Sequence, residues 1–263
     1  GMDITLQAIS GVMSVTGEED GPPLKTAAAF ADFIAGTHLY AAIVTALFRR
    51  ETTGQGAIVD ISMQDCVFPT LATTIGSFYA KGKQMPRAGN RHTGNTLAPY
   101  NTYVASDGYI AIICIREGHF KKLCQAMDRP ELAEDPRFHN FAARCQNVTE
   151  LDAEITRWSA PKSRQTLLAL TQAHGVICAP VNHLSEVVNY PHMSARGTLH
   201  QRHHETLGLI AQMQTPLRLS GDTPPALTSP AALGADSSEV LHDLLGLSQA
   251  DMATLVEQGA IAL

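Results

Sequence analysis

The chain has 263 residues, of which 44% are hydrophobic and 17% charged, so its apolar content supports a sizeable core and excludes a long disordered chain. Nineteen basic and 25 acidic residues give a net charge of -6, which excludes a general nucleic-acid binder because no excess positive charge displaces phosphate counterions. The five cysteines include no CxxC pair, which favours reduced thiols in a cytoplasmic protein over a disulfide scaffold or a zinc ribbon.

The first 80 residues read as mainly helical. The chain opens with an amphipathic helix from Leu6 to Met13, and Ala27–Arg50 predicts a long helix that is apolar on most faces and therefore buried. A strand is predicted over Ala57–Ser62, and a helix over Asp65–Tyr79 with Pro69 in its first turns.

Neither a secretory signal nor a membrane span is expected. No basic-then-apolar leader opens the chain. The long apolar stretch contains Asp32 and His38 and ends in Arg49-Arg50-Glu51. These polar and charged residues interrupt it too much for a membrane-spanning helix to be expected.

The rest of the chain predicts a mixture of helices and strands. Ser106-Asp107-Gly108 joins two β-rich runs, which is a strong hairpin signal. A β-like region at 197–219 and a proline-rich stretch at 223–230 precede the end of the chain. Further helices are expected at 120–127, 148–158, 163–174, 184–188, 239–245 and 249–258, and a further strand at 176–181.

A middle domain inserted between two parts of an outer domain is the natural interpretation. The predicted ranges are residues 1–80 for part of the outer domain, 81–97 for a linker or active-site loop, 98–196 for a small α+β domain, and 197–263 for a return segment.

Asp32 is the first candidate site residue, because a carboxylate rarely lies in an apolar helix without a partner. The amides and positive dipole at a helix N-terminus supply such a partner. The spacing favours a helix N-cap, and a preorganised carboxylate nucleophile is compatible with that position.

The second candidate is the loop from Arg87 to Asn95. Its arginines are suited to phosphate or carboxylate, and its glycines permit close approach of the backbone to a ligand. A solvated linker explains the same composition. The candidate substrate-binding residues are Gly89, Asn90, Arg91, His92 and Gly94.

Other motifs are weaker. Glu117 and His119 are of an acid or base type, but polar residues are usual at a strand-to-helix junction. The histidines at 200, 203 and 204 lack HExxH order, so no metal site is predicted. Neither a GxGxxG nor a GxSxG sequence is present, so neither a dinucleotide site nor an ordinary serine hydrolase is expected.

An ordered series of short motifs runs through almost the whole chain and resembles the family III coenzyme A transferases, the group of carnitine–CoA transferase, formyl-CoA transferase and α-methylacyl-CoA racemase. The motifs are Gly1-Met2-Asp3 with Gln7-Ala8-Ile9-Ser10-Gly11, Phe30-Ala31-Asp32, Thr53-Gly54, Gly89-Asn90-Arg91, Ala98-Pro99-Tyr100, Asp107-Gly108-Tyr109, Asp135-Pro136-Arg137-Phe138 with Arg144, Pro180-Val181-Asn182 and Pro216-Leu217-Arg218-Leu219.

This resemblance implies an α/β fold with a Rossmann-like large domain, incomplete here, a smaller α+β domain, and an interlocked homodimer. It implies CoA transfer from an acyl-CoA thioester to a carboxylic acid through an aspartyl-CoA thioester on Asp32, with no tightly bound cofactor and CoA thioester as substrate. The loop is expected to act as a mobile lid over the acyl group.

Two departures from the family pattern leave alternatives open. Arg91-His92-Thr93-Gly94-Asn95 replaces the run of glycines of the formyl-CoA transferases. Members also carry a long N-terminal half before this opening segment, so the chain resembles a C-terminal portion. The alternatives are a 2-methylacyl-CoA racemase or epimerase that uses the same aspartate as acid and base, and a non-catalytic dimerisation or CoA-binding remnant.

Overall fold

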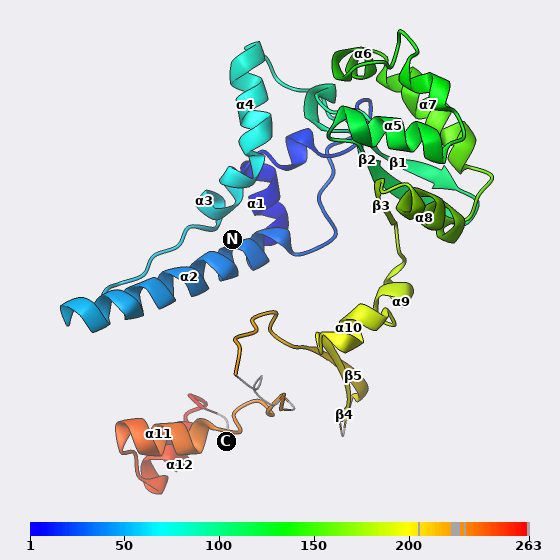
Figure 1. The fold of residues 1–263 in the computed structure, drawn as a ribbon. Coiled ribbons are helices and arrows are strands. Elements are labelled where there is room, and N and C mark those ends of the chain that lie inside the picture. The colour runs from blue at the N-terminus through cyan, green and yellow to red at the C-terminus, as the bar shows by residue number, and fades with distance from the viewer. Residues whose placement is uncertain (205, 222–226, 229, 262–263) are drawn as a thin grey trace. The chain divides into compact units, whose positions relative to one another are not determined.

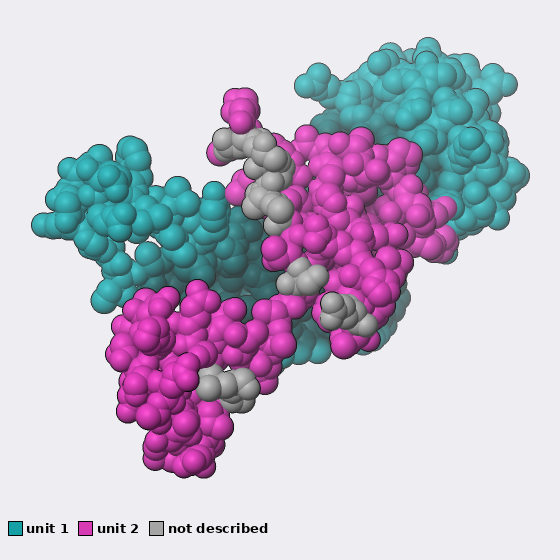
Figure 2. Space-filling view, turned by 90° about the horizontal axis from the view of Figure 1, so that it is seen from below, with its two compact units in different colours: residues 1–181 teal, residues 182–263 magenta. Residues whose placement is uncertain are grey.

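The computed structural model describes residues 1–204, 206–221, 227–228 and 230–261, which form two compact units. Unit 1 comprises residues 1–181 and unit 2 comprises residues 182–263 (Figure 2). The division falls after Val181, upstream of the predicted limit at 196, and the four predicted domain ranges stay predictions.

Unit 1 begins with a group of helices and short 3-10 turns. They are α1 (Asp3–Ile9), η1 (Met13–Val15), α2 (Phe30–Thr53), α3 (Met63–Val67), η2 (Phe68–Leu71) and α4 (Ala72–Lys81) (Figure 1). Pro69 lies in the first turn of η2, where its missing N–H interrupts the single helix predicted over 65–79. A small cluster of Val12, Ala31 and Val67, with Leu6 of α1 packed against it, joins α1, α2 and α3.

The prediction that α2 is buried is wrong for this chain. Ala31 is its only buried residue, and Phe33 and Phe48 are each 72% exposed. Among the described residues, α2 is the helix long and apolar enough to cross a membrane, although only 11% of its most apolar window is buried. Length and composition alone do not separate a membrane span from a core helix of a soluble protein.

The predicted strand at residues 57–62 is also absent. These residues form no regular structure, and Ile58 is 99% exposed. A strand needs a neighbour to satisfy its backbone N–H and C=O groups, and no described segment pairs with this one. The apolar sequence therefore predicted the wrong local structure.

The second part of unit 1 is built on a three-stranded antiparallel sheet in the order β1-β2-β3 (Figure 1). Tyr103 pairs with Ile110 in the predicted hairpin, which is confirmed. The elements of this part are β1 (Tyr100–Ala105), β2 (Gly108–Ile113), α5 (Glu117–Ala126), η4 (Pro130–Ala133), α6 (Phe141–Gln146), α7 (Val148–Ser159), α8 (Arg164–Ala173) and β3 (Ile177–Pro180).

Alternation along the strands places one face of the sheet in the core. Tyr103, Ala105, Ile110 and Ile112 are buried, whereas Val104 between two of them is exposed. The buried side chains join residues of α5, α7 and α8 in one hydrophobic cluster. This part of the chain therefore closes a core of its own.

Arg144 on α6 packs against this core and has no exposed side-chain surface. Its guanidinium donates to the carbonyls of Ala98 at 3.0 Å and Phe138 at 3.1 Å, and to Glu117 Oε2 at 2.8 Å. It also stacks 4.5 Å from the centre of the Phe120 ring. A buried charge is tolerated only with such partners.

Unit 2 contains a β-hairpin between short helices. Its elements are α9 (Leu184–Val187), α10 (Pro191–Ala195), β4 (Leu199–His204), β5 (Gly208–Met213), α11 (Ser237–Leu245) and α12 (Gln249–Glu257). The predicted terminal helices and the β-like region are confirmed. Of the predicted proline-rich stretch, residues 223–226 and 229 lie outside the described residues.

The fold is therefore mixed α and β, as the sequence predicted. The described strands form two small antiparallel sheets. The Rossmann-like large domain stays a prediction, because that fold requires parallel strands.

Candidate active site

Asp32 lies in the first turn of α2, as its third residue, and its side chain is exposed. The N-cap is Ala29, which has no side-chain acceptor, so the prediction that Asp32 caps the helix is wrong. The helix begins three residues earlier than a cap at Asp32 requires. The Asp32 carboxylate makes no hydrogen bond with the described residues and is open to a ligand.

The helix start is instead capped from a distant part of the sequence. Asp3 Oδ1 on α1 accepts a 2.9 Å hydrogen bond from the N–H of Ala31, the residue directly before Asp32. A carboxylate at this end of a helix also interacts favourably with the helix dipole. Sequence reasoning missed this role of Asp3, since nothing local links residues 3 and 31.

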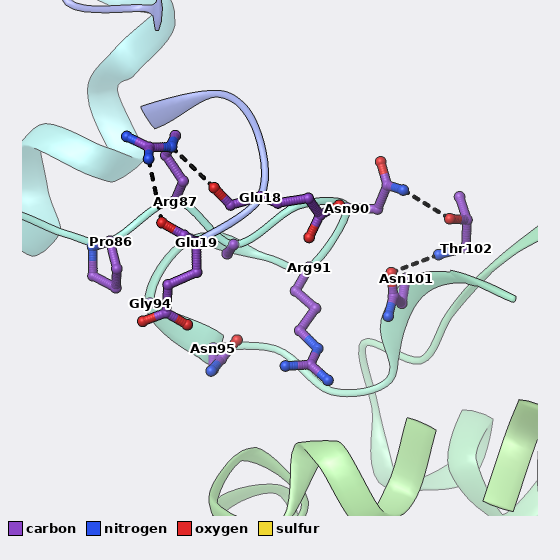
Figure 3. A pocket seen from close by; sticks show the side chains of 11 residues that line it. Glu18, Glu19, Pro86, Arg87, Asn90, Arg91, Gly94, Asn95, Asn101 and Thr102 are labelled. Atoms are coloured by element: carbon purple, nitrogen blue, oxygen red, sulfur yellow. Dashed lines mark hydrogen bonds between the residues drawn. The ribbon is translucent and has the colours of Figure 1, made fainter. Parts of the chain in front are cut away.

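The candidate loop lines a polar cavity of about 400 Å³ (Figure 3). Glu18 and Glu19 line the same cavity, and the sequence did not single them out. Asp32 is not among the described residues that line it. The structure therefore gathers the loop and these two glutamates around one space and leaves Asp32 outside it.

Both loop arginines, Arg87 and Arg91, donate hydrogen bonds to other residues of the protein. Arg87 donates to the main-chain carbonyls of Glu18 and Glu19, at 3.0 and 3.2 Å (Figure 3), and to that of Gly21. Arg91 Nε donates to Asp152 Oδ2 at 2.8 Å. Their use for phosphate or carboxylate, which the sequence suggested, stays a prediction.

The other candidate loop residues also have defined contacts. The Gly89 N–H donates to the Gly17 carbonyl at 2.9 Å. Asn90 Nδ2 donates to Thr102 Oγ1 at 2.8 Å, and His92 Nδ1 lies 2.6 Å from Thr96 Oγ1. Gly94 has a φ of 66° in a tight turn packed against Met85. The loop is thus built into unit 1, and its predicted mobility as a lid stays a prediction.

Asp152 on α7 is the acceptor that holds this loop to the sheet. Besides Arg91, it accepts hydrogen bonds from Asn101 Nδ2 at 2.9 Å and the Tyr103 hydroxyl at 2.8 Å. Burial, followed by the neighbouring Asp152 charge, raises the pKa of Tyr103 well above its usual value. Sequence reasoning missed Asp152. The signal that could have identified it is a carboxylate on the buried face of a predicted helix, beside Leu151 and Ile155.

The structure assigns Glu117 a structural role. Its carboxylate pairs with buried Arg144, and its other oxygen accepts from the N–H of Phe141 at 2.8 Å. The hydrogen bond from Arg144 is the main cause that lowers the pKa of Glu117. Among the described residues, no group of three His, Cys, Asp or Glu side chains is arranged to hold a metal ion.

Comparisons with known proteins agree on one family. The model of CoA-transferase family III matches residues 1–237. Succinyl-CoA:mesaconate CoA-transferase from Haloarcula hispanica is 35% identical over 75% of this chain and 48% of its own length. Succinyl-CoA–D-citramalate CoA-transferase from Chloroflexus aurantiacus is 33% identical over 95% of this chain and 62% of its own length. The chain thus spans about half to two thirds of these curated relatives.

Solved structures give the same result. A CAIB/BAIF family protein from Brucella suis matches with a TM-score of 0.76 and 33% identity, over 93% of this chain and 63% of that protein. Rv3272 from Mycobacterium tuberculosis matches with a TM-score of 0.77 at 24% identity, which shows the fold alone. Together with the match over residues 1–237, these similarities show that the chain belongs to CoA-transferase family III.

Proposed function

We propose that the protein transfers coenzyme A from an acyl-CoA thioester to a carboxylic acid, with Asp32 as the nucleophile. The observation that carries this proposal is the exposed Asp32 carboxylate in the capped first turn of α2, in a chain that belongs to CoA-transferase family III. The two curated relatives reported above are named as CoA-transferases, which favours transfer over epimerisation.

In the proposed reaction, an Asp32 carboxylate oxygen attacks the thioester carbonyl and expels CoA thiolate, which leaves a mixed anhydride. The thiolate then attacks the aspartyl carbonyl, so that the donor acid leaves and an aspartyl-CoA thioester remains. The acceptor carboxylate attacks this thioester and expels the thiolate again. Attack of the thiolate on the acceptor's acyl carbonyl gives the new acyl-CoA and returns Asp32. Covalent catalysis of this kind divides one difficult exchange into reversible steps.

Replacement of the nucleophile tests this proposal in the intact natural protein. Asp32→Asn is expected to lower transfer by on the order of 10³-fold or more without loss of folding. Glu51→Gln is the matched control, because it changes an exposed acid near the other end of the same helix. The donor is succinyl-CoA, and the acceptors are mesaconate and D-citramalate, which the names of the reported relatives supply.

Two further measurements separate the alternatives. Hydroxylamine is expected to trap the aspartyl thioester as a hydroxamate on Asp32. Deuterium wash-in at Cα of a 2-methylacyl-CoA without CoA exchange indicates an epimerase instead. Full transfer by the Asp32→Asn protein overturns the assignment of the nucleophile.

The proposal includes a homodimer of the interlocked kind. Its support is the apolar surface of α2, where Phe33 and Phe48 are exposed in the single chain, and large apolar patches are typical of interaction surfaces. Light scattering of the intact natural protein is expected to give twice the chain mass. A monomer at micromolar concentration overturns this part.

A further inference from the structure

Three side chains fix the point at which the chain enters α2, and we name them the α2 clamp: Asp3, Gln7 and Thr26. We infer that the α2 clamp positions Asp32 for the reaction, so that Asp3 and Gln7 are positioning residues. This inference rests on the proposed function, because it assigns the clamp a role in placing the nucleophile.

The first part of the argument is the absence of a local cap. Ala29 at the N-cap position has no side-chain oxygen, so the first N–H groups of α2 have no acceptor from the cap residue. Asp3 Oδ1 accepts the hydrogen bond of Ala31 at 2.9 Å. The negative charge that stabilises the start of α2 is therefore the carboxylate of Asp3 on α1.

The second part is that Asp3 is itself held by a buried residue. Gln7 is 0% exposed, and its Nε2 donates to Asp3 Oδ2 at 2.8 Å. Gln7 Oε1 accepts from the Thr26 N–H at 3.0 Å. Both ends of the Gln7 amide are used, so its orientation is fixed by complementary donors and acceptors.

The third part is the position of the contacts along the chain. Thr26 Oγ1 donates to the Ala28 carbonyl at 3.1 Å, just before the N-cap, and Asp3 holds Ala31 just after it. The clamp thus holds the backbone on both sides of the helix start. Asp32 follows Ala31 directly, while its own side chain has no described hydrogen bond, so its placement depends on the backbone of this turn.

The hydrogen-bond pattern provides a test by exchange of donors and acceptors. Asp3→Asn places an amide NH₂ opposite the NH₂ of Gln7, and Gln7→Glu places a carboxylate opposite that of Asp3. Each single change breaks the pair, whereas the double change Asp3→Asn/Gln7→Glu restores one donor and one acceptor. Asp243→Asn on α11 is the control, because it removes an exposed carboxylate from unit 2.

The measurements are kcat and KM of CoA transfer per folded protein, and hydrogen exchange of the first turn of α2. Each single variant is expected to lower kcat by on the order of 10- to 100-fold with KM changed less than about threefold, since small misplacement of a reacting group costs rate. In each single variant, the rate of amide hydrogen exchange at residues 31–33 is expected to rise. The double variant is expected to recover most of both losses.

Several outcomes overturn the inference. A purely structural clamp lowers the thermal midpoint but leaves kcat per folded protein unchanged, and a double variant without recovery shows that the pair does not act as described. Transfer that persists in Asp32→Asn defeats the proposed function instead. Loss of transfer in Asp32→Asn with normal kcat in both single clamp variants defeats only the positioning role.

Discussion

Residues 98–181 and residues 1–81 belong to the same unit but differ sharply in how they bury apolar side chains. The sheet and helices of 98–181 share one cluster with fully buried members such as Phe138, Leu123 and Ile155. In residues 1–81 the buried cluster contains only Val12, Ala31 and Val67, while α2 leaves most of its apolar side chains exposed.

This difference means that the region that contributes most to stability is not the region that carries the proposed nucleophile. Burial of apolar surface is the main favourable contribution to folding, so residues 98–181 supply most of the folding free energy of unit 1. Asp32 lies in the less buried region, where a few hydrogen bonds determine local geometry. Substitutions in the first region are therefore expected to act on stability, and those around Asp32 on rate.

The largest expected stability effect is at Arg144. Arg144→Ala removes the buried guanidinium, leaves a cavity, and deprives the Ala98 and Phe138 carbonyls of a donor. We expect a loss of about 3–5 kcal/mol in the free energy of unfolding, measured by urea denaturation. Arg157→Ala on α7 is the control, since its side chain is 68% exposed and its loss costs less than about 1 kcal/mol. Equal effects of the two variants contradict the role assigned to Arg144.

The next effect is at Asp152, which joins the loop to the well-packed region. Asp152→Ala removes the acceptor of Arg91, Asn101 and Tyr103 and is expected to cost about 2–3 kcal/mol. A double-mutant cycle with Arg91→Ala isolates the coupling of that pair, expected at about 1 kcal/mol because both side chains are only partly exposed. If the losses of the two single variants simply add in the double variant, the contact between Arg91 and Asp152 does not hold the loop.

Gly89→Ala tests the backbone of the loop. Gly89 has a φ of 58°, and an added Cβ lies 2.8 Å from both carboxylate oxygens of Glu18. Because Glu18 is exposed and can move aside, the main cost is the left-handed backbone, about 1 kcal/mol. Gly76→Ala on α4 is the matched control, where nothing lies within 4 Å and a gain of about 0.5–1 kcal/mol is expected. Thermal unfolding that shifts equally in both variants contradicts this account.

The smallest effect concerns Glu117 at low pH. Its pKa is lowered in the folded state, so it binds a proton at higher pH when unfolded, near its usual value of about 4.3. The contribution of Glu117 to the free energy of unfolding is fully present above that value and is lost as the pH falls through the lower folded pKa. Since half of its side chain is exposed, the effect is below about 1 kcal/mol. Urea denaturation from pH 6 to 3 is expected to give a shallower loss of stability for Glu117→Gln. An unchanged slope indicates that the pair with Arg144 adds nothing.

By itself the sequence determined the family and those local elements whose signals lie between neighbouring residues. The Asp107-Gly108 turn specified the hairpin, and helical periodicity specified α5, α7 and α8, because these signals come from neighbouring residues. The ordered motifs identified the family, which the match over residues 1–237 confirmed.

Tertiary structure decided the remainder, because each case depends on a partner distant in sequence. The run at 57–62 is apolar but pairs with no strand in the part of the chain that the structure describes, and α2 is apolar but has only one buried residue. The cap of α2 comes from Asp3, and the partner of Arg91 comes from Asp152. A hydrogen-bond acceptor supplied by a remote residue leaves no local pattern, so only the folded chain reveals which carboxylate meets which N–H.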